Sequence, residues 1–245
     1  MPLAENPRYL RQRKLLGNQE HKLHGLTVAI VGVGGIGSFA ALLGAQLGVK
    51  KLVLIDRDRV RGTDLGRQAL YGEADIGKPK VEAAKKKLQE INPTVSAEAK
   101  FEQLDDKNAV RLLKGTDVVL DGTDNYETKR ALNRYGIRKK KTVMFSSALK
   151  HEGWVFASVP LKTCFECWAP RPKQEASCEQ VGVLNTTVAL AASLQVQELV
   201  NWTLGNGRRG GNEMLRFELD PFRLEEIKVE KRSGCPACGV GNERK

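Results

Sequence analysis

The stretch Leu26–Gly37, LTVAIVGVGGIG, is the strongest indicator of the fold in this 245-residue chain. Its first half is a continuous apolar run rich in β-branched residues, which is typical of a buried strand in a parallel sheet. A loop with four glycines follows directly: Gly32, Gly34, Gly35 and Gly37. Residues 36–47 then have helical periodicity. A strand, a glycine loop and a helix in this order let backbone N–H groups approach a phosphate, so the stretch predicts a nucleotide-binding β-α-β unit.

The alternation of apolar segments and helical patterns continues beyond this unit. We expect further strands at residues 52–55, 95–101, 117–120, 142–146 and 154–159. We expect helices at residues 78–90, 107–113, 126–138 and 184–204, and two short strands at 214–219 and 226–229. The pattern predicts an α/β fold with a doubly wound, Rossmann-like, mostly parallel sheet and an antiparallel portion near the C-terminus.

We interpret residues 1–245 as a single domain with three parts. Residues 1–24 form a helical arm, residues 25–159 the nucleotide-binding part, and residues 160–245 a second part with little periodicity at its start. The first 24 residues hold no secretory signal, and polar residues interrupt the apolar stretch 183–204, which argues against a membrane span. These features predict a cytoplasmic protein.

The chain is basic, with 40 Lys and Arg against 29 Asp and Glu and a formal net charge of +11. Such an excess suits RNA, an acidic protein partner or a merely solvated surface. No aromatic residues interleave the basic runs at 85–87 and 138–141, as a stacking platform for single strands requires. We therefore expect no nucleic-acid partner.

Polar side chains that suit a nucleotide follow the glycine loop. Asp56 ends the next apolar segment, about 20 residues after the loop, where a carboxylate accepts hydrogen bonds from ribose hydroxyls. Arg67, Gln68 and Lys80 supply donors suited to a polyphosphate. Asp124 follows another strand end, where a carboxylate can hold Mg²⁺. Taken singly, Arg67 and Lys80 fit ordinary surface positions, and the glycine loop alone also fits NAD or FAD.

Four of the five cysteines form two Cys-x-x-Cys pairs, Cys164/Cys167 and Cys235/Cys238. Two such pairs complete a tetrahedral structural Zn²⁺ site, which would join the C-terminal segment to the middle of the chain. A redox pair is the alternative, but no thioredoxin-like context surrounds either pair. The fifth, Cys178, is either an unreactive thiol or a nucleophile.

The ordered motifs of the chain resemble those of the ThiF/MoeB/HesA-type adenylyltransferases, prokaryotic relatives of ubiquitin-activating enzymes. The matching motifs are RYLRQ (8–12), GVGGIG (32–37), DRD (56–58), RQ (67–68), DIGKPK (75–80), INP (91–93) and GTDN (122–125). The family also has the two cysteine pairs. The resemblance runs from about residue 8 to residue 238, nearly the whole chain.

This resemblance implies an enzyme that uses ATP and Mg²⁺ to adenylate the C-terminal glycine carboxylate of a small ubiquitin-like or sulfur-carrier protein, with release of pyrophosphate. It places Asp56 on the ribose and Asp124 on Mg²⁺. It also implies that Arg67, Gln68 and Lys80 bind the phosphates. The carrier is expected to end in Gly-Gly.

Asp64 departs from the family pattern, which usually has an asparagine three residues before the arginine. An extra anion near the phosphates should weaken ATP binding unless Mg²⁺ or Arg67 compensates. The nucleotide-binding candidates also include Asp64, because of its position before Arg67, and the motif residues Gly32, Gly34, Gly35, Gly37, Asp58 and Asn125.

The resemblance further implies a homodimer in which Arg11 reaches the ATP site of the other subunit. Cys178 matches a cysteine that in some members forms a thioester or a disulfide with the carrier. Arg11 and Cys178 are therefore candidate catalytic residues together with Arg67, Lys80 and Asp124.

Three alternatives stay open beside this interpretation: an NAD-dependent oxidoreductase, a zinc-containing scaffold without turnover, and a tRNA-modifying dehydratase of the same superfamily. No rhodanese or ubiquitin-fold module is expected within the chain, so a sulfur donor or conjugation acceptor should be a separate molecule. The sequence leaves the pathway undetermined among thiamine, molybdopterin, tRNA thiolation and protein conjugation.

Overall fold

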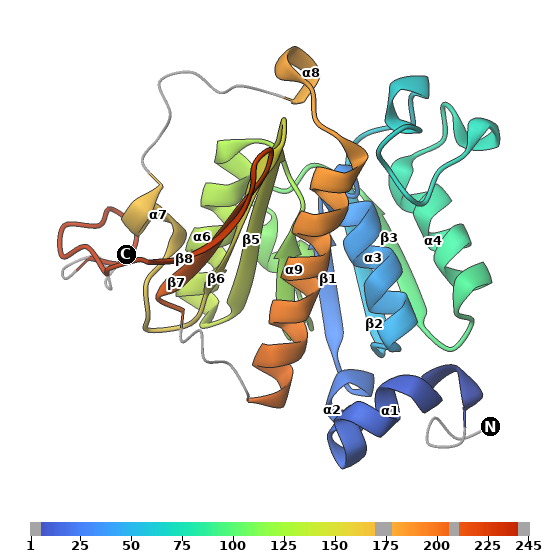
Figure 1. Cartoon of the computed structure of the whole chain (residues 1–245), viewed down its shortest axis with the longest axis horizontal. Coiled ribbons are helices and arrows are strands. Elements are labelled where there is room, and N and C mark those ends of the chain that lie inside the picture. The colour runs from blue at the N-terminus through green and yellow to red at the C-terminus, as the bar shows by residue number, and fades with distance from the viewer. Residues whose placement is uncertain (1–5, 170–177, 206–210, 240–245) are drawn as a thin grey trace.

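The computed structural model describes residues 6–169, 178–205 and 211–239; the side chains of residues 178 and 179 lie outside this description. One eight-stranded sheet runs through the molecule, with helices on both faces (Figure 1). The strands are β1 (Thr27–Val31), β2 (Lys51–Asp56), β3 (Ser96–Phe101), β4 (Val118–Asp121), β5 (Thr142–Leu149), β6 (Glu152–Ser158), β7 (Glu213–Leu219) and β8 (Phe222–Lys228).

The α-helices of the described residues are α1 (Leu10–Leu16), α2 (Glu20–His24), α3 (Gly35–Leu47), α4 (Lys80–Ile91), α5 (Ala109–Leu112), α6 (Tyr126–Lys139), α7 (Phe165–Trp168), α8 (Cys178–Val181) and α9 (Asn185–Leu204). Short 3₁₀ helices include η4 (Gly62–Asp64) and η5 (Glu73–Asp75). No helix in the described ranges has the length and apolar character needed to cross a membrane.

The strand order is β3-β2-β1-β4-β5-β6-β7-β8. The first four pairings, from β3 to β5, are parallel, and the last three, from β5 to β8, are antiparallel. The order reverses between β1 and β4, because β2 and β3 lie on one side of β1 while β4 and β5 lie on the other. The predicted doubly wound sheet with an antiparallel portion is confirmed. Ligands of such folds bind where the strand order reverses.

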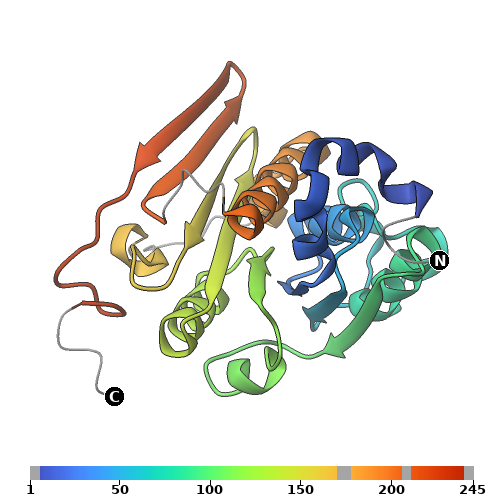
Figure 2. The same cartoon turned by 90° about the horizontal axis from the view of Figure 1, so that it is seen from below.

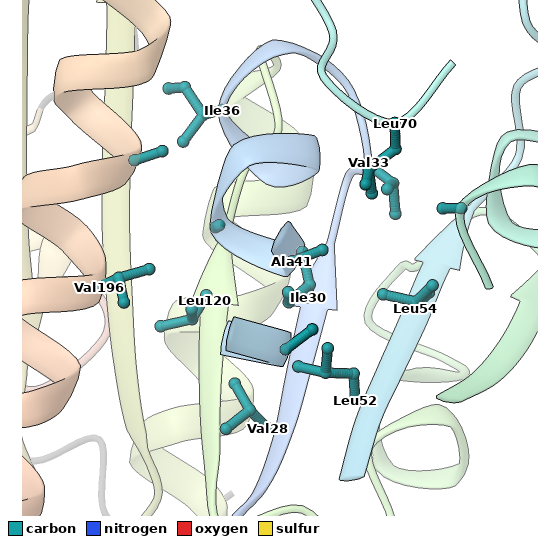
Figure 3. Packing of buried hydrophobic residues seen from close by; sticks show 14 of the residues in the cluster. Val28, Ile30, Val33, Ile36, Ala41, Leu52, Leu54, Leu70, Leu120 and Val196 are labelled. Carbon is teal, nitrogen blue, oxygen red and sulfur yellow. The ribbon is translucent and has the colours of Figure 1, made fainter. Parts of the chain in front are cut away.

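One face of the sheet packs against α3, α4 and α9. Alternate residues of β1, β2 and β4, among them Val28, Ile30, Leu52, Leu54 and Leu120, point into this layer and are buried (Figure 3). Apolar residues of α3 and α9 cover them. This layer fixes the direction of α3, so that its first turn lies beside the end of β1.

The opposite face packs against α5, α6 and α7. The intervening strand residues, such as Ala29, Val31, Val119 and Phe145, point into this second layer. Burial on both faces explains why the first strands read as continuous apolar runs rather than as alternating ones.

The N-terminal arm lies beyond the end of the sheet that is opposite α8, near α3 and α9 (Figures 1 and 2). Tyr9 is fully buried there, and its hydroxyl accepts a hydrogen bond from Asn92 Nδ2 at 2.8 Å. A Cβ atom on Gly48, the C-cap of α3, would lie 2.6 Å from the Tyr9 ring. The arm is therefore packed tightly against the nucleotide-binding part.

The structure extends two of the predicted strands. β5 continues to Leu149 because it forms a hairpin with β6, and β8 begins at Phe222 rather than at residue 226. Most of β8 is exposed, with Phe222 70% accessible, so backbone pairing to β7 forms this strand without an apolar pattern that the sequence would reveal.

Candidate functional site

A cavity of about 730 Å³ lies at the carboxyl ends of β1, β2 and β4. Its volume is in the range of ligand sites for small molecules. The lining includes most of the nucleotide-binding candidates: Gly32, Gly34, Gly35, Asp56, Asp58, Asp64, Arg67, Gln68, Lys80, Asp124 and Asn125. The structure therefore brings together residues that are spread over almost a hundred positions of the sequence.

The glycine loop is shaped by close backbone contacts. Gly32 has a φ of +79°, which favours glycine, and a Cβ atom on Gly37 would lie 1.8 Å from the Gly32 carbonyl oxygen. Gly37 thus serves packing and is not part of the cavity wall. Gly34, by contrast, is the N-cap of α3, and a Cβ atom there would meet only Gln68 Nε2, at 3.9 Å. The first N–H groups of α3 consequently adjoin the cavity, where an anion is favoured.

Asp56 joins the end of β2 to the glycine loop. Its Oδ2 accepts from the Val33 N–H at 2.7 Å, and its Oδ1 accepts from the Asp58 N–H at 2.8 Å. Burial raises the pKa of Asp56 above its ordinary value, while these hydrogen bonds and the charge of Lys80 act in the opposite direction. Burial also raises the pKa of Tyr71, whose hydroxyl donates to the Val33 carbonyl and supports the loop from behind.

The three predicted phosphate ligands surround the carboxylate of Asp64. Gln68 Nε2 donates to Asp64 Oδ1 at 2.6 Å, Arg67 Nη2 lies 3.4 Å from the same oxygen, and Lys80 Nζ lies 3.3 Å from Oδ2. Oδ2 also accepts from the Arg61 N–H at 3.0 Å, which caps η4. Asp64, Gln68 and Lys80 are all buried. The sequence places these groups in one site, but it does not reveal that they pair with one another.

Behind Asp124 lies a buried polar network that the sequence analysis missed. Asp121 is fully buried at the end of β4 and forms an ion pair with Lys129 Nζ, which also donates to the Ser146 carbonyl at 2.7 Å. Asp121 Oδ1 accepts from the N–H and the hydroxyl of Thr123, at 3.1 and 2.6 Å. The network therefore fixes the loop that carries Asp124. The signal in the sequence was Asp121 itself, a charged residue at the end of an apolar strand.

Two further groups hold the same loop. Gln195 of α9 is fully buried and donates from Nε2 to the carbonyls of Asp121 and Met144, at 2.9 and 2.7 Å. Asn125 lines the cavity but also caps α6, because its side chain accepts from the Thr128 N–H at 2.9 Å. Asn125 therefore has a structural role in addition to its predicted one. Asp124 itself is exposed and lines the cavity, so its carboxylate is available to ligate a divalent cation.

The two cysteine pairs come together in the structure. All four Sγ atoms lie within 4.8 Å of one another, with 3.8 Å between Cys164 and Cys167, 3.6 Å between Cys164 and Cys235, and 3.4 Å between Cys167 and Cys238. Sulfurs about 3.8 Å apart are what a tetrahedron with Zn–S bonds near 2.3 Å requires, so the cluster fits a metal ion. Burial raises the pKa of the Cys164 thiol and that of Cys238, the latter to about 12.

A polar side chain of α6 supports this cysteine cluster. Asn133 Nδ2 lies 3.5 Å from Cys164 Sγ and donates to Glu166 at 2.9 Å, while Asn133 Oδ1 accepts from the Phe165 N–H. Glu166 is buried and also pairs with Arg130 at 3.3 Å. The first cysteine pair is thus attached to the same helix that begins beside Asp124.

Two predicted catalytic residues are not placed in the cavity by the described structure. Arg11 is exposed on α1 and does not line the cavity. Helix α1 lies beyond the end of the sheet opposite α8 (Figure 1), whereas the cavity lies at the carboxyl ends of β1, β2 and β4. Cys178 begins α8, but its side chain lies outside the described part of the chain.

Comparisons with known proteins agree on a single family. The ThiF family model matches residues 9–237. A molybdopterin-synthase adenylyltransferase of Escherichia coli (strain K12) is 32% identical over 95% of this chain and 96% of its own length. A sulfur carrier protein adenylyltransferase of Thermus thermophilus is 30% identical over 96% of this chain and 91% of its own length.

The fold is shared with a solved structure as well. E. coli MccB in complex with MccA-N7isoASN superposes with a TM-score of 0.84 over 96% of this chain and 76% of that one, at 21% identity. The family model and the two enzymes cover nearly the whole chain, and both enzymes are adenylyltransferases. The chain therefore belongs to the ThiF family and is an adenylyltransferase.

Proposed function

We propose that this enzyme uses ATP to adenylate the C-terminal glycine carboxylate of a small ubiquitin-fold carrier protein. The observation that carries the proposal is the cavity at the ends of β1, β2 and β4, where a helix N-terminus, Asp56, Arg67, Lys80 and Asp124 face one space. A dinucleotide site needs neither the basic pair nor the exposed carboxylate. The T. thermophilus relative is named a sulfur carrier protein adenylyltransferase, which supports a carrier-protein substrate.

The nucleotide would lie across the glycine loop. Asp56 would accept from ribose hydroxyls, since each of its oxygens keeps a further lone pair after its backbone hydrogen bond. The first turn of α3 and the side chains of Arg67, Gln68 and Lys80 would hold the phosphates. Gln68 Oε1 is an acceptor and is buried without a hydrogen-bond partner in the described structure, so a donor of the nucleotide such as a ribose hydroxyl, and not a phosphate oxygen, would satisfy it.

The reaction needs no nucleophile from the protein. A carboxylate oxygen of the carrier forms a bond to the α-phosphorus, the bond from that phosphorus to the bridging oxygen breaks, and the electron pair leaves with pyrophosphate. Arg67 and Lys80 stabilise the negative charge that develops on the leaving group. Asp124 would hold Mg²⁺, which neutralises phosphate oxygens when bound. The main contribution of the protein is therefore positioning and electrostatic stabilisation.

We further propose that the four cysteines hold a structural Zn²⁺ with no open position. The geometry of the sulfurs and the amide of Asn133 beside Cys164 support this proposal. Reduced, metal-binding cysteines suit the cytoplasm, where we place the reaction. Cys178 would act only after adenylation, when the activated carrier passes to a thiol or to a separate sulfur donor or acceptor.

We propose a homodimer in which Arg11 serves the cavity of the partner subunit. Two observations support it. Helix α1 carries two exposed leucines, Leu15 at 86% and Leu10 at 50%, on either side of Arg11 in the sequence. Arg11 does not line the cavity of its own subunit. Mixing subunits with Arg11→Ala and subunits with Lys80→Ala should restore part of the activity that each variant lacks, because mixed dimers contain one intact site. No restoration in mixtures that form dimers would refute the shared site.

The decisive experiment is exchange of labelled pyrophosphate into ATP, with and without each small Gly-Gly-ended protein of the same genome. We expect exchange with one carrier, and none when its last glycine is removed. Asp124→Ala should abolish exchange, whereas Cys178→Ala should retain exchange and block only later transfer. Exchange with a free small carboxylate, or binding of a nicotinamide nucleotide in place of ATP, would refute the proposed function.

A further inference from the structure

Among the described residues that line the cavity, acidic side chains outnumber basic ones. Its cationic side chains are Arg57, Arg61, Arg67 and Lys80. Its acidic side chains are Asp56, Asp58, Asp64, Glu102 and Asp124. Asp64 is the most deeply buried of the five acids, with 3% of its surface accessible, and Asp56 is half-buried. A triphosphate bound in this space would meet more acidic than basic side chains, so a divalent cation bound with it would make its binding more favourable.

Asp64 already occupies the groups that a phosphate needs. Its two oxygens lie within 3.4 Å of Arg67 Nη2, Gln68 Nε2 and Lys80 Nζ, and all three are predicted phosphate ligands. Lys80 Nζ also lies 4.0 Å from Asp58 Oδ2. These contacts satisfy the buried Lys80 in the absence of any ligand. The capping bond from the Arg61 N–H needs an acceptor oxygen but no negative charge.

We propose that Asp64 is an internal counter-ion that occupies the phosphate-binding side chains and thereby sets the affinity of the cavity for polyphosphates. This inference rests on the proposed function, because it takes the cavity to be the ATP site. An incoming phosphate must share Lys80 and Arg67 with Asp64, and the two anions repel each other in a region shielded from water. The same repulsion makes polyphosphate binding depend on divalent cations, whose charge offsets that of the carboxylate.

The test compares Asp64→Asn with a matched control, Asp75→Asn. Asp75 is the last residue of η5, as Asp64 is of η4, and it accepts from the Gly72 N–H at 3.2 Å in the same capping arrangement. It also pairs with a basic residue three positions later, Lys78, at 3.0 Å. Because Asp75 does not line the cavity, its variant removes one charge from the same local motif without touching the phosphate ligands.

Isothermal titration should give the affinity for ATP and for tripolyphosphate, each in EDTA and in excess Mg²⁺. We expect Asp64→Asn to lower the Kd of both ligands about tenfold in EDTA and by a smaller factor in Mg²⁺. Asp64→Ser removes the same charge with a smaller side chain and should change Kd in the same direction. Asp75→Asn should leave every Kd unchanged. Unchanged or weaker binding by both Asp64 variants, folded at the assay temperature, would overturn the proposal.

Melting of the ligand-free protein supplies a second readout. Asp64→Asn should melt at a lower temperature than the wild type and Asp75→Asn, since the buried Lys80 loses its counter-ion. Tripolyphosphate should then raise the melting temperature of Asp64→Asn by more than it raises that of the wild type. An equal melting temperature in all three ligand-free proteins would contradict the counter-ion role. Tighter tripolyphosphate binding without pyrophosphate exchange would reject the proposed function alone, whereas exchange with unchanged affinities would reject this inference alone.

Discussion

Replacing Lys129 with methionine should reveal how strongly the buried network supports the site. Asp121 is fully buried, and Lys129 Nζ donates a hydrogen bond to its Oδ2. The substitution leaves a buried carboxylate without its counter-ion, which costs about 3–5 kcal/mol of folding free energy. For a chain of this length the cost corresponds to a fall of about 6–20 °C in melting temperature.

Denaturant unfolding of a double-mutant cycle with Asp121→Asn isolates the pair. The double variant should recover at least about 2 kcal/mol relative to Lys129→Met, because no uncompensated charge remains and the amide oxygen still accepts from Thr123. Arg134→Met on the same helix is the control: its pair with Asp106 at 3.0 Å is exposed to solvent and should contribute little.

The same network supports function, because Thr123 connects Asp121 to the loop that carries Asp124. Lys129→Met should therefore weaken ATP binding even at temperatures where the variant remains folded. Strictly additive effects in the cycle, or a cost for Lys129→Met no larger than that for Arg134→Met, would refute the assigned role of the ion pair.

Three other predictions concern separate parts of the chain. Gly37→Ala should prevent folding or shift the glycine loop, since its new Cβ would lie 1.8 Å from the Gly32 carbonyl oxygen. In the control Gly72→Ala the new Cβ has nothing within 4 Å, so its circular dichroism and melting temperature should be unchanged. Equal melting temperatures of the two variants would contradict the packing argument. Cys235→Ser should lose bound zinc by elemental analysis and become sensitive to proteolysis near the C-terminus, and full retention of metal would disprove the four-cysteine site. Burial lowers the pKa of His24 below its ordinary value of 6.5, so the unfolded chain takes up a proton more readily than the folded chain. The free energy of unfolding, measured with denaturant, should therefore fall as the pH drops below 6.5. His24→Phe should remove this contribution to the pH dependence of stability.

Local patterns were enough to predict the parallel half of the fold. The stretch 26–37 gives the first strand, the glycine loop and the helix, since the apolar run, the glycines and the 3.6-residue periodicity each depend on neighbouring residues. The site residues at strand ends followed from the same logic, because parallel strands in such sheets place their carboxyl ends at a common edge. The exposed strand β8 was predicted too short, since its pairing leaves no apolar signal.

Sequence patterns were sufficient to predict the order of strands and helices along the chain, the family resemblance and the residue types available to a nucleotide. The two cysteine pairs meet as the sequence predicted. The pairing of the buried charges, Asp64 with Lys80 and Asp121 with Lys129, is visible only in three dimensions. These partners meet through loops and crossovers of the chain, so their contacts depend on the strand order and on the packing of helices against the sheet. Periodicity along the sequence records which side of a segment is buried, but it carries no information on which distant side chain lies opposite.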